Sequence, residues 1–169
     1  MPSLPNAFLF TSLTFLSAAG FGGRLVAGEM PAADRLIFHG GVSGLFDAEK
    51  PPAFATEYRF GRKWIGLQPW LSAGWATDGA TLFGGGVTRA FALDSRWEAV
   101  LGFGPGYYDR HEGQDLGNHL EFYSFAELSC ELRAGHRVLL RLGHISNGSL
   151  GDSNPGTELL TLGYSVSLP

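Results

Sequence analysis

The sequence lacks the features of several large protein classes. Cys130 is its one cysteine, which excludes a disulfide within the chain. Charged residues make up 17 %, below the roughly 25 % of soluble domains, and the net charge of −4 provides no basic surface for nucleic acid. Beyond residue 35, no segment is apolar for long enough to form a transmembrane helix, and none shows a sustained helical repeat. A membrane location of this part of the chain therefore requires a β-barrel.

Glycine and aromatic residues are abundant instead. The chain has 25 glycines, about twice the average share, and 13 % aromatic residues. This composition suits short strands, tight turns and a surface that faces lipid. A soluble β-sandwich has a similar composition, so composition alone leaves both classes open.

The N-terminus is typical of an exported protein. An apolar run over 7–19 is followed by small residues, and Val26-Ala27-Gly28 offers a cleavage site. The run is too short to span a bilayer permanently. The segment before it has no Lys or Arg, which departs from the usual pattern. We predict a signal peptide over 1–28, with an uncertain cleavage site, and a single domain over 29–169.

The rest of the chain divides into eight strand-like segments separated by turn residues. They cover 35–46, 53–61, 65–77, 80–92, 96–109, 119–132, 136–146 and 157–168. Short turns at 61–64, 93–96 and 133–136 alternate with longer polar connections at 47–52, 110–118 and 147–156, and 77–80 is a short exception. Such alternation is typical of an exported barrel with both termini on the periplasmic side. The pattern predicts an all-β fold, an eight-stranded antiparallel outer-membrane barrel.

Alternation along the segments predicts which side chains face lipid. One face forms an aliphatic stripe that consists of Leu140, Leu142, Leu160, Leu162 and Tyr164. The opposite face carries Glu127, Glu131 and Arg141. Alternation by itself does not distinguish the inside of a barrel from its outside. The polar face is too sparse for a solvated surface, which favours a buried charge network inside and the stripe in contact with lipid.

Three residues with complementary chemistry fall near the last turn. His144 and Ser146 are two apart on one segment, so both side chains leave the same face. Glu158 opens the next segment. If the hairpin pairs His144 with Glu158, the three side chains meet on the lipid side near the outer rim, because opposed residues lie about 5 Å apart at Cβ.

This combination fits nucleophilic catalysis. An imidazole activates a serine hydroxyl, and a carboxylate orients the imidazole and stabilises its charged form. Asn147 is a candidate oxyanion donor through its side-chain amide. A His-x-Ser at a strand end is also common at barrel rims without any catalytic role. A metal site is disfavoured because this stretch holds a single histidine and no clustered second ligand.

The motif His144-x-Ser146-Asn147, followed by Asn154-Pro-Gly-x-Glu158 and a final strand, resembles the signature of the lipid A 3-O-deacylases of the PagL type. The resemblance implies an outer-membrane barrel enzyme that removes the 3-O-linked acyl chain of lipid A in lipopolysaccharide. It implies Ser146 as nucleophile, His144 as base, Glu158 as orienting carboxylate and Asn147 as oxyanion donor. It also implies no metal and no organic cofactor. Ser149 stands where some relatives have glycine, which leaves a second oxyanion donor unassigned.

Two other functions remain open at this level. A non-catalytic outer-membrane barrel with a structural or adhesive role predicts the same strands and no need for Ser146. A soluble lipocalin-like binder predicts a protein that stays in solution without detergent. The acyl chain selected, activity on phospholipids and a homodimer stay open too.

Overall fold

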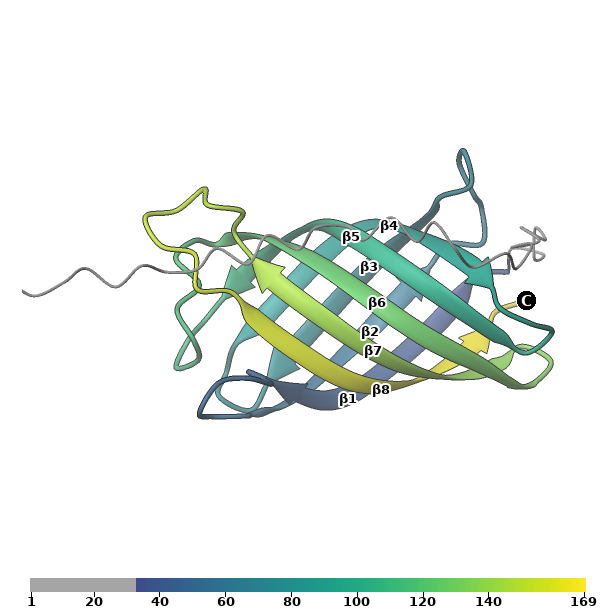
Figure 1. The fold of residues 1–169 in the computed structure, drawn as a ribbon, viewed down its shortest axis with the longest axis horizontal. Helices are drawn as coiled ribbons and strands as arrows, with labels where there is room; N and C mark the ends of the chain where they lie inside the picture. The colour runs from purple at the N-terminus through teal and green to yellow at the C-terminus, as the bar shows by residue number, and fades with distance from the viewer. Residues whose placement is uncertain (1–32) are drawn as a thin grey trace, which may run out of the picture.

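The computed structural model describes residues 33–169, so the signal peptide predicted over 1–28 lies outside the described residues. Eight strands follow in order: β1 (Arg35–Ser43), β2 (Pro52–Arg59), β3 (Gln68–Ala76), β4 (Thr81–Ala92), β5 (Trp97–Asp109), β6 (Leu120–Arg133), β7 (His136–Ser146) and β8 (Thr157–Ser167). Each pairs antiparallel with the next, and β8 pairs with β1 to close a barrel (Figure 1). The predicted eight-stranded barrel is confirmed. Residues 33–169 hold no helix long and apolar enough to cross a membrane.

The connections separate onto the two ends of the barrel. Figure 1 shows the connections β1–β2, β5–β6 and β7–β8 at one end, and the C-terminus with the β4–β5 and β6–β7 turns at the other.

Two predicted strand ends are corrected. β1 stops at Ser43, because Gly44 adopts a φ of 65° and begins a turn. β3 starts at Gln68, because Ile65 and Gly66 have φ of 48° and 79°, which an extended strand does not allow.

The predicted inside and outside of the barrel are confirmed. Leu142 is 47 % exposed and Leu162 is 68 % exposed on the outer surface, whereas Arg141 is 2 % exposed. An eight-stranded barrel is just wide enough for side chains to fill its interior. The alternate residues of each strand therefore pack inward, and aliphatic and aromatic side chains cover the surface that faces lipid.

Four buried charges form a network across the barrel interior. Glu57 and Arg59 come from β2, Glu127 from β6 and Arg141 from β7, each with a side chain no more than 4 % exposed. Arg141 donates to Glu57 at 2.7 Å and to Glu127 at 2.5 and 2.9 Å. Arg59 donates to Glu57 at 2.6 and 2.9 Å and to Glu127 at 3.2 Å. The network has no net charge, so both of its carboxylates, Glu57 and Glu127, are compensated by its two arginines.

Glu131 does not join this network, which corrects its predicted place. The register between β6 and β7 shifts between Glu131 and Arg133. The Glu131 side chain is 29 % exposed and meets Arg137 at 3.4 Å instead of Arg141. The shift lies beyond Glu131, which is the regular register partner of Arg137, four residues along β6 from Glu127 and close to the β6–β7 turn. Alternation along the strand therefore overestimates the burial of Glu131.

The connection 110–119 covers the mouth of the barrel at the end that carries the long loops. Its residue Leu116 is 1 % exposed and belongs to the hydrophobic cluster that includes Tyr108, Tyr123 and Ile145. This loop therefore packs onto the barrel interior, next to the connection 147–156.

Candidate active site

The β7–β8 hairpin has the register that brings His144 opposite Glu158, the condition on which the site expected from the sequence depends. His144 lies opposite Glu158, Leu142 opposite Leu160 and Leu140 opposite Leu162. The His144 side chain is 46 % exposed and that of Glu158 is 29 % exposed. Both lie on the outer surface of the barrel, at the strand ends next to the loop 147–156.

His144 and Glu158 form a direct contact. His144 Nδ1 and Glu158 Oε1 are 3.2 Å apart. A carboxylate only accepts hydrogen bonds, so Nδ1 carries the hydrogen and the other ring nitrogen, Nε2, is left to act as a base. Gly156 packs against the far edge of the ring, because a Cβ at this position would lie 2.8 Å from His144 Cε1. With a φ of 67°, Gly156 also has a backbone conformation that favours glycine.

Ser146 lies two residues beyond His144 on the same face of β7, opposite Phe122 of β6, and it is half-buried. Within the described residues, the side-chain hydrogen bond of His144 goes to Glu158, and one to Ser146 is not formed. Such nucleophile–base hydrogen bonds are often long in unliganded enzymes and tighten with substrate.

A second serine flanks the imidazole from the other side. Ser124 of β6 is the register partner of His144, and its hydroxyl donates to the His144 carbonyl oxygen at 3.5 Å. Sequence reasoning missed this neighbour. Counting residue pairs back from the short turn between β6 and β7 would predict the partner of His144. The register shift next to Arg133 makes this count wrong by one residue.

The sequence predicts that the side-chain amide of Asn147 is an oxyanion donor. In the structure this amide is engaged within the loops. It is fully buried, and its amide donates to the carbonyl oxygens of Leu116 at 2.8 Å and Ser153 at 2.7 Å. Its Oδ1 accepts from the Ser149 N–H at 2.8 Å, and its own N–H donates to Asn154 Oδ1 at 3.0 Å. In this conformation the side chain therefore holds the loop and has no free amide hydrogen for an oxyanion.

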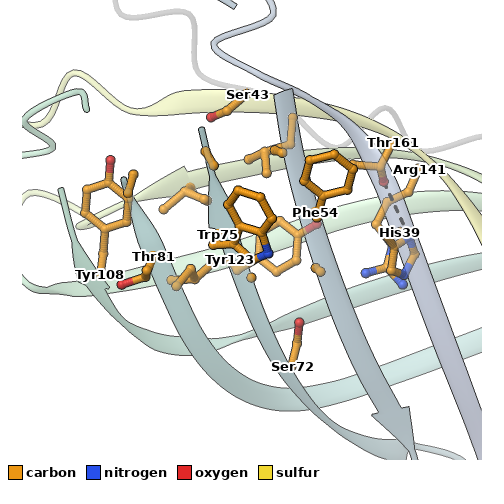
Figure 2. A pocket seen from close by; sticks show the side chains of 18 residues that line it. His39, Ser43, Phe54, Ser72, Trp75, Thr81, Tyr108, Tyr123, Arg141 and Thr161 are labelled. Atoms are coloured by element: carbon orange, nitrogen blue, oxygen red, sulfur yellow. Dashed lines mark hydrogen bonds between the residues drawn. The ribbon is translucent and has the colours of Figure 1, made fainter. Parts of the chain in front are cut away.

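A small pocket inside the barrel is separate from this hairpin. It has a volume of about 70 Å³, and none of His144, Ser146 and Glu158 lines it. Figure 2 shows His39 beside Thr161 and Arg141, with Tyr108 at the opposite end of the pocket. Among residues 33–169, no three His, Cys, Asp or Glu side chains gather in a way that could hold a metal ion.

The architecture defines the class of protein. A closed eight-stranded barrel with an apolar outer surface and a charged interior is that of an outer-membrane protein. This one carries a serine, a histidine and a carboxylate on the membrane-facing side of one hairpin. Residues 44–167 match the model of the family described as lipid A 3-O-deacylase (PagL). The chain belongs to this family of outer-membrane enzymes.

Solved structures show the same fold. The crystal structure of the outer membrane enzyme PagL is 18 % identical, with 80 % of this chain and 100 % of that chain covered and a TM-score of 0.62. A de novo designed transmembrane β-barrel is 10 % identical, with 82 % and 98 % covered and a TM-score of 0.62. Neisserial surface protein A (NspA) is 10 % identical, with 80 % and 96 % covered and a TM-score of 0.56. No curated protein matches the sequence significantly.

Proposed function

We propose that this chain hydrolyses the ester that links the 3-O-acyl chain to lipid A, with Ser146 as nucleophile, His144 as base and Glu158 as orienting carboxylate. The observation that supports this best is the 3.2 Å contact between His144 and Glu158 on the outer surface of the barrel. Charged and polar groups on a lipid-facing surface are costly unless they have partners, and they tend to be functional. Family membership supplies the substrate class.

The three side chains suffice for a two-step acyl transfer. Ser146 Oγ attacks the ester carbonyl carbon while His144 Nε2 takes the hydroxyl proton. Glu158 stabilises the imidazolium that forms. The tetrahedral intermediate collapses as the sugar oxygen leaves with the proton from His144, which leaves an acyl-Ser146. A water molecule, deprotonated by His144, then attacks this ester, and collapse of the second intermediate releases the fatty acid and returns the proton to Ser146.

The place of the site on the barrel suits this substrate. Ser146 ends β7 at the rim next to the loop 147–156, and aliphatic residues such as Leu142 and Leu160 continue from it along the barrel surface. A lipid anchored in the same leaflet reaches this surface by lateral diffusion, with its ester groups between the sugar and the hydrocarbon. The substrate then needs no passage into the barrel interior.

We infer that Asn147 serves the oxyanion through its main-chain N–H. This N–H directly follows the nucleophile in the chain, a position that supplies an oxyanion donor in other serine hydrolases. Its present acceptor is the amide oxygen of Asn154, an exposed residue that a substrate oxygen can displace. The buried Asn147 side chain keeps this part of the backbone in place.

The test compares three serine and histidine variants of the barrel folded in detergent. Ser146→Ala and His144→Asn are each expected to abolish release of the fatty acid from lipid A, measured by mass spectrometry of both products. Ser124→Ala is the matched control, because this serine flanks the same imidazole. It is expected to retain activity. Full deacylation by folded Ser146→Ala would refute the mechanism, and loss of activity in Ser124→Ala alone would assign the nucleophile to Ser124.

Two further comparisons test the triad as a unit. The double variant of Ser146 and His144 is expected to be no less active than either single variant, because nucleophile and base act together. Glu158→Ala is expected to be milder than either, since the imidazole keeps its chemistry and loses only its orientation and charge partner.

A further inference from the structure

The connection 110–119 reaches the loop 147–156 at the nucleophile end. The Leu116 carbonyl oxygen accepts from the side-chain amide of Asn147, the residue after Ser146, at 2.8 Å. The next residue, Gly117, lies so close to the opposite loop that a Cβ there would be 2.3 Å from the Ser153 carbonyl oxygen. The buried Leu116 side chain anchors this contact in the mouth of the barrel.

The same connection reaches the histidine end of that loop. Gln114 Nε2 donates to the Gly156 carbonyl oxygen at 3.1 Å, and Gly156 packs against the His144 ring. Gln114 is fixed in turn by β5, because its carbonyl oxygen accepts a hydrogen bond from the hydroxyl of the buried Tyr108 at 2.9 Å. One short connection therefore supports the backbone next to the nucleophile and the backbone that contacts the imidazole.

We propose that the connection 110–119 is a positioning element of the active site and that Gln114 is its main positioning residue. Its contacts run through Asn147 and Gly156, so it acts on Ser146 and His144 through other residues. This inference rests on the proposed roles of Ser146 and His144. Nothing in the motif around Ser146 and Glu158 assigns a role to this part of the chain.

A positioning role has a measurable size. A neutral hydrogen bond between the loops contributes about 1 kcal/mol, so its loss populates displaced loop conformations about fivefold more. Misplacement of reacting groups by about 1 Å costs up to a hundredfold in rate. Because the active fraction falls by no more than this factor, loss of the Gln114 donor is expected to lower kcat by up to about fivefold. KM for lipid A is expected to stay nearly unchanged, since Gln114 reaches the proposed catalytic side chains only through the loop.

The first experiment uses the full barrel folded in detergent. Gln114→Ala removes the side chain, and Gln114→Glu keeps its length but removes the amide donor. Glu112→Gln is the control, an exposed position in the same connection. For each variant, kcat and KM are measured with lipid A in mixed micelles. The rate at which a fluorophosphonate labels Ser146 is measured in parallel, since it reports the reactivity of the nucleophile without lipid A.

Gly117→Ala perturbs the nucleophile end independently. The added methyl group meets the Ser153 carbonyl oxygen, and the φ of 87° strains it as well. Gly66→Ala is the matched control, because Gly66 has a φ of 79° in a turn at the other end of the barrel and a Cβ there meets nothing within 4 Å. Both variants carry the backbone strain, but only Gly117→Ala is expected to lower kcat and the labelling rate.

Equal kcat and labelling rates in the Gln114 variants and Glu112→Gln would overturn the proposal. A higher KM with unchanged kcat would also overturn it, because it would make the connection a substrate-binding element. A fall in kcat that only follows a loss of folded barrel on heat-modifiability gels would do the same. These outcomes differ from failure of the triad, in which folded Ser146→Ala keeps its activity and fluorophosphonate does not label Ser146.

Discussion

Removal of one carboxylate from the interior charge network should destabilise the barrel strongly. Glu127→Leu leaves Arg59 and Arg141 with Glu57 as their only partner in the network, so one positive charge becomes uncompensated in a region no more than 4 % exposed. Breaking a buried ion pair in this way costs about 3–5 kcal/mol. Four of the seven hydrogen bonds of the network end on Glu127, which places the cost towards the upper part of this range.

A double variant separates the loss of charge balance from the loss of side-chain volume. Glu127→Leu combined with Arg141→Met leaves the neutral pair Glu57–Arg59, in which Arg59 Nη2 and Glu57 Oε1 are 2.6 Å apart. Replacement of a whole buried pair by apolar residues is often neutral or stabilising, so much of the loss should be recovered. Glu131→Leu is the control and should cost less than about 1 kcal/mol, because Glu131 is partly exposed and its contact is long.

Urea titration of the barrel in lipid vesicles measures these differences. Tryptophan fluorescence and the gel shift between folded and unfolded barrel are followed in both directions until unfolding and refolding curves coincide. A cost below about 1 kcal/mol for Glu127→Leu would refute the view that charge balance controls the interior. A double variant that loses the sum of both single variants would refute it too.

The remaining predictions concern the lipid face and the site loop. Leu162→Arg should destabilise the barrel by about 2–4 kcal/mol, whereas Leu132→Arg, at the end of β6, should cost about 0–1 kcal/mol, as the same urea titration will show. Comparable costs at both positions would contradict the assigned membrane depth. Asn147→Ala should lower kcat on the order of a hundredfold, because the backbone next to Ser146 loses its anchors. Asn154→Ala should change kcat little if substrate displaces this side chain, and a loss equal to that of Asn147→Ala would assign Asn154 a role during turnover.

The β7–β8 hairpin shows how far sequence reasoning extends. Alternation places Leu142 and Leu160 on one face, and this arrangement is compatible with His144 opposite Glu158, the pairing that the structure has. A shift by one residue would turn every aliphatic side chain inward, so burial strongly specifies this register. Local pattern was sufficient here because both partners lie on adjacent strands.

Pattern alone was less successful where the chain departs from regular geometry. Alternation predicts Glu131 in the interior network, but its register partner is Arg137, four residues along β6 from the Glu127–Arg141 pair. The motif predicts that the Asn147 side-chain amide is free to bind an oxyanion, but in the structure this amide donates to the carbonyl oxygen of Leu116, thirty-one residues earlier in the chain. Neither the position of a charge along a strand nor a contact between loops follows from periodicity alone.

The sequence by itself determined the number of strands, the face of each strand on which a side chain lies, and the common face of His144 and Ser146. A two-residue period and short turns are local properties of the chain. Only the tertiary structure decided that Glu57 and Arg59 of β2 form ion pairs with Arg141 and Glu127. It also decided that Gln114 donates a hydrogen bond to Gly156, which contacts the His144 ring. These contacts join residues far apart in sequence. Closure of the barrel brings them together, and the order of residues along the chain does not specify which distant side chains then meet.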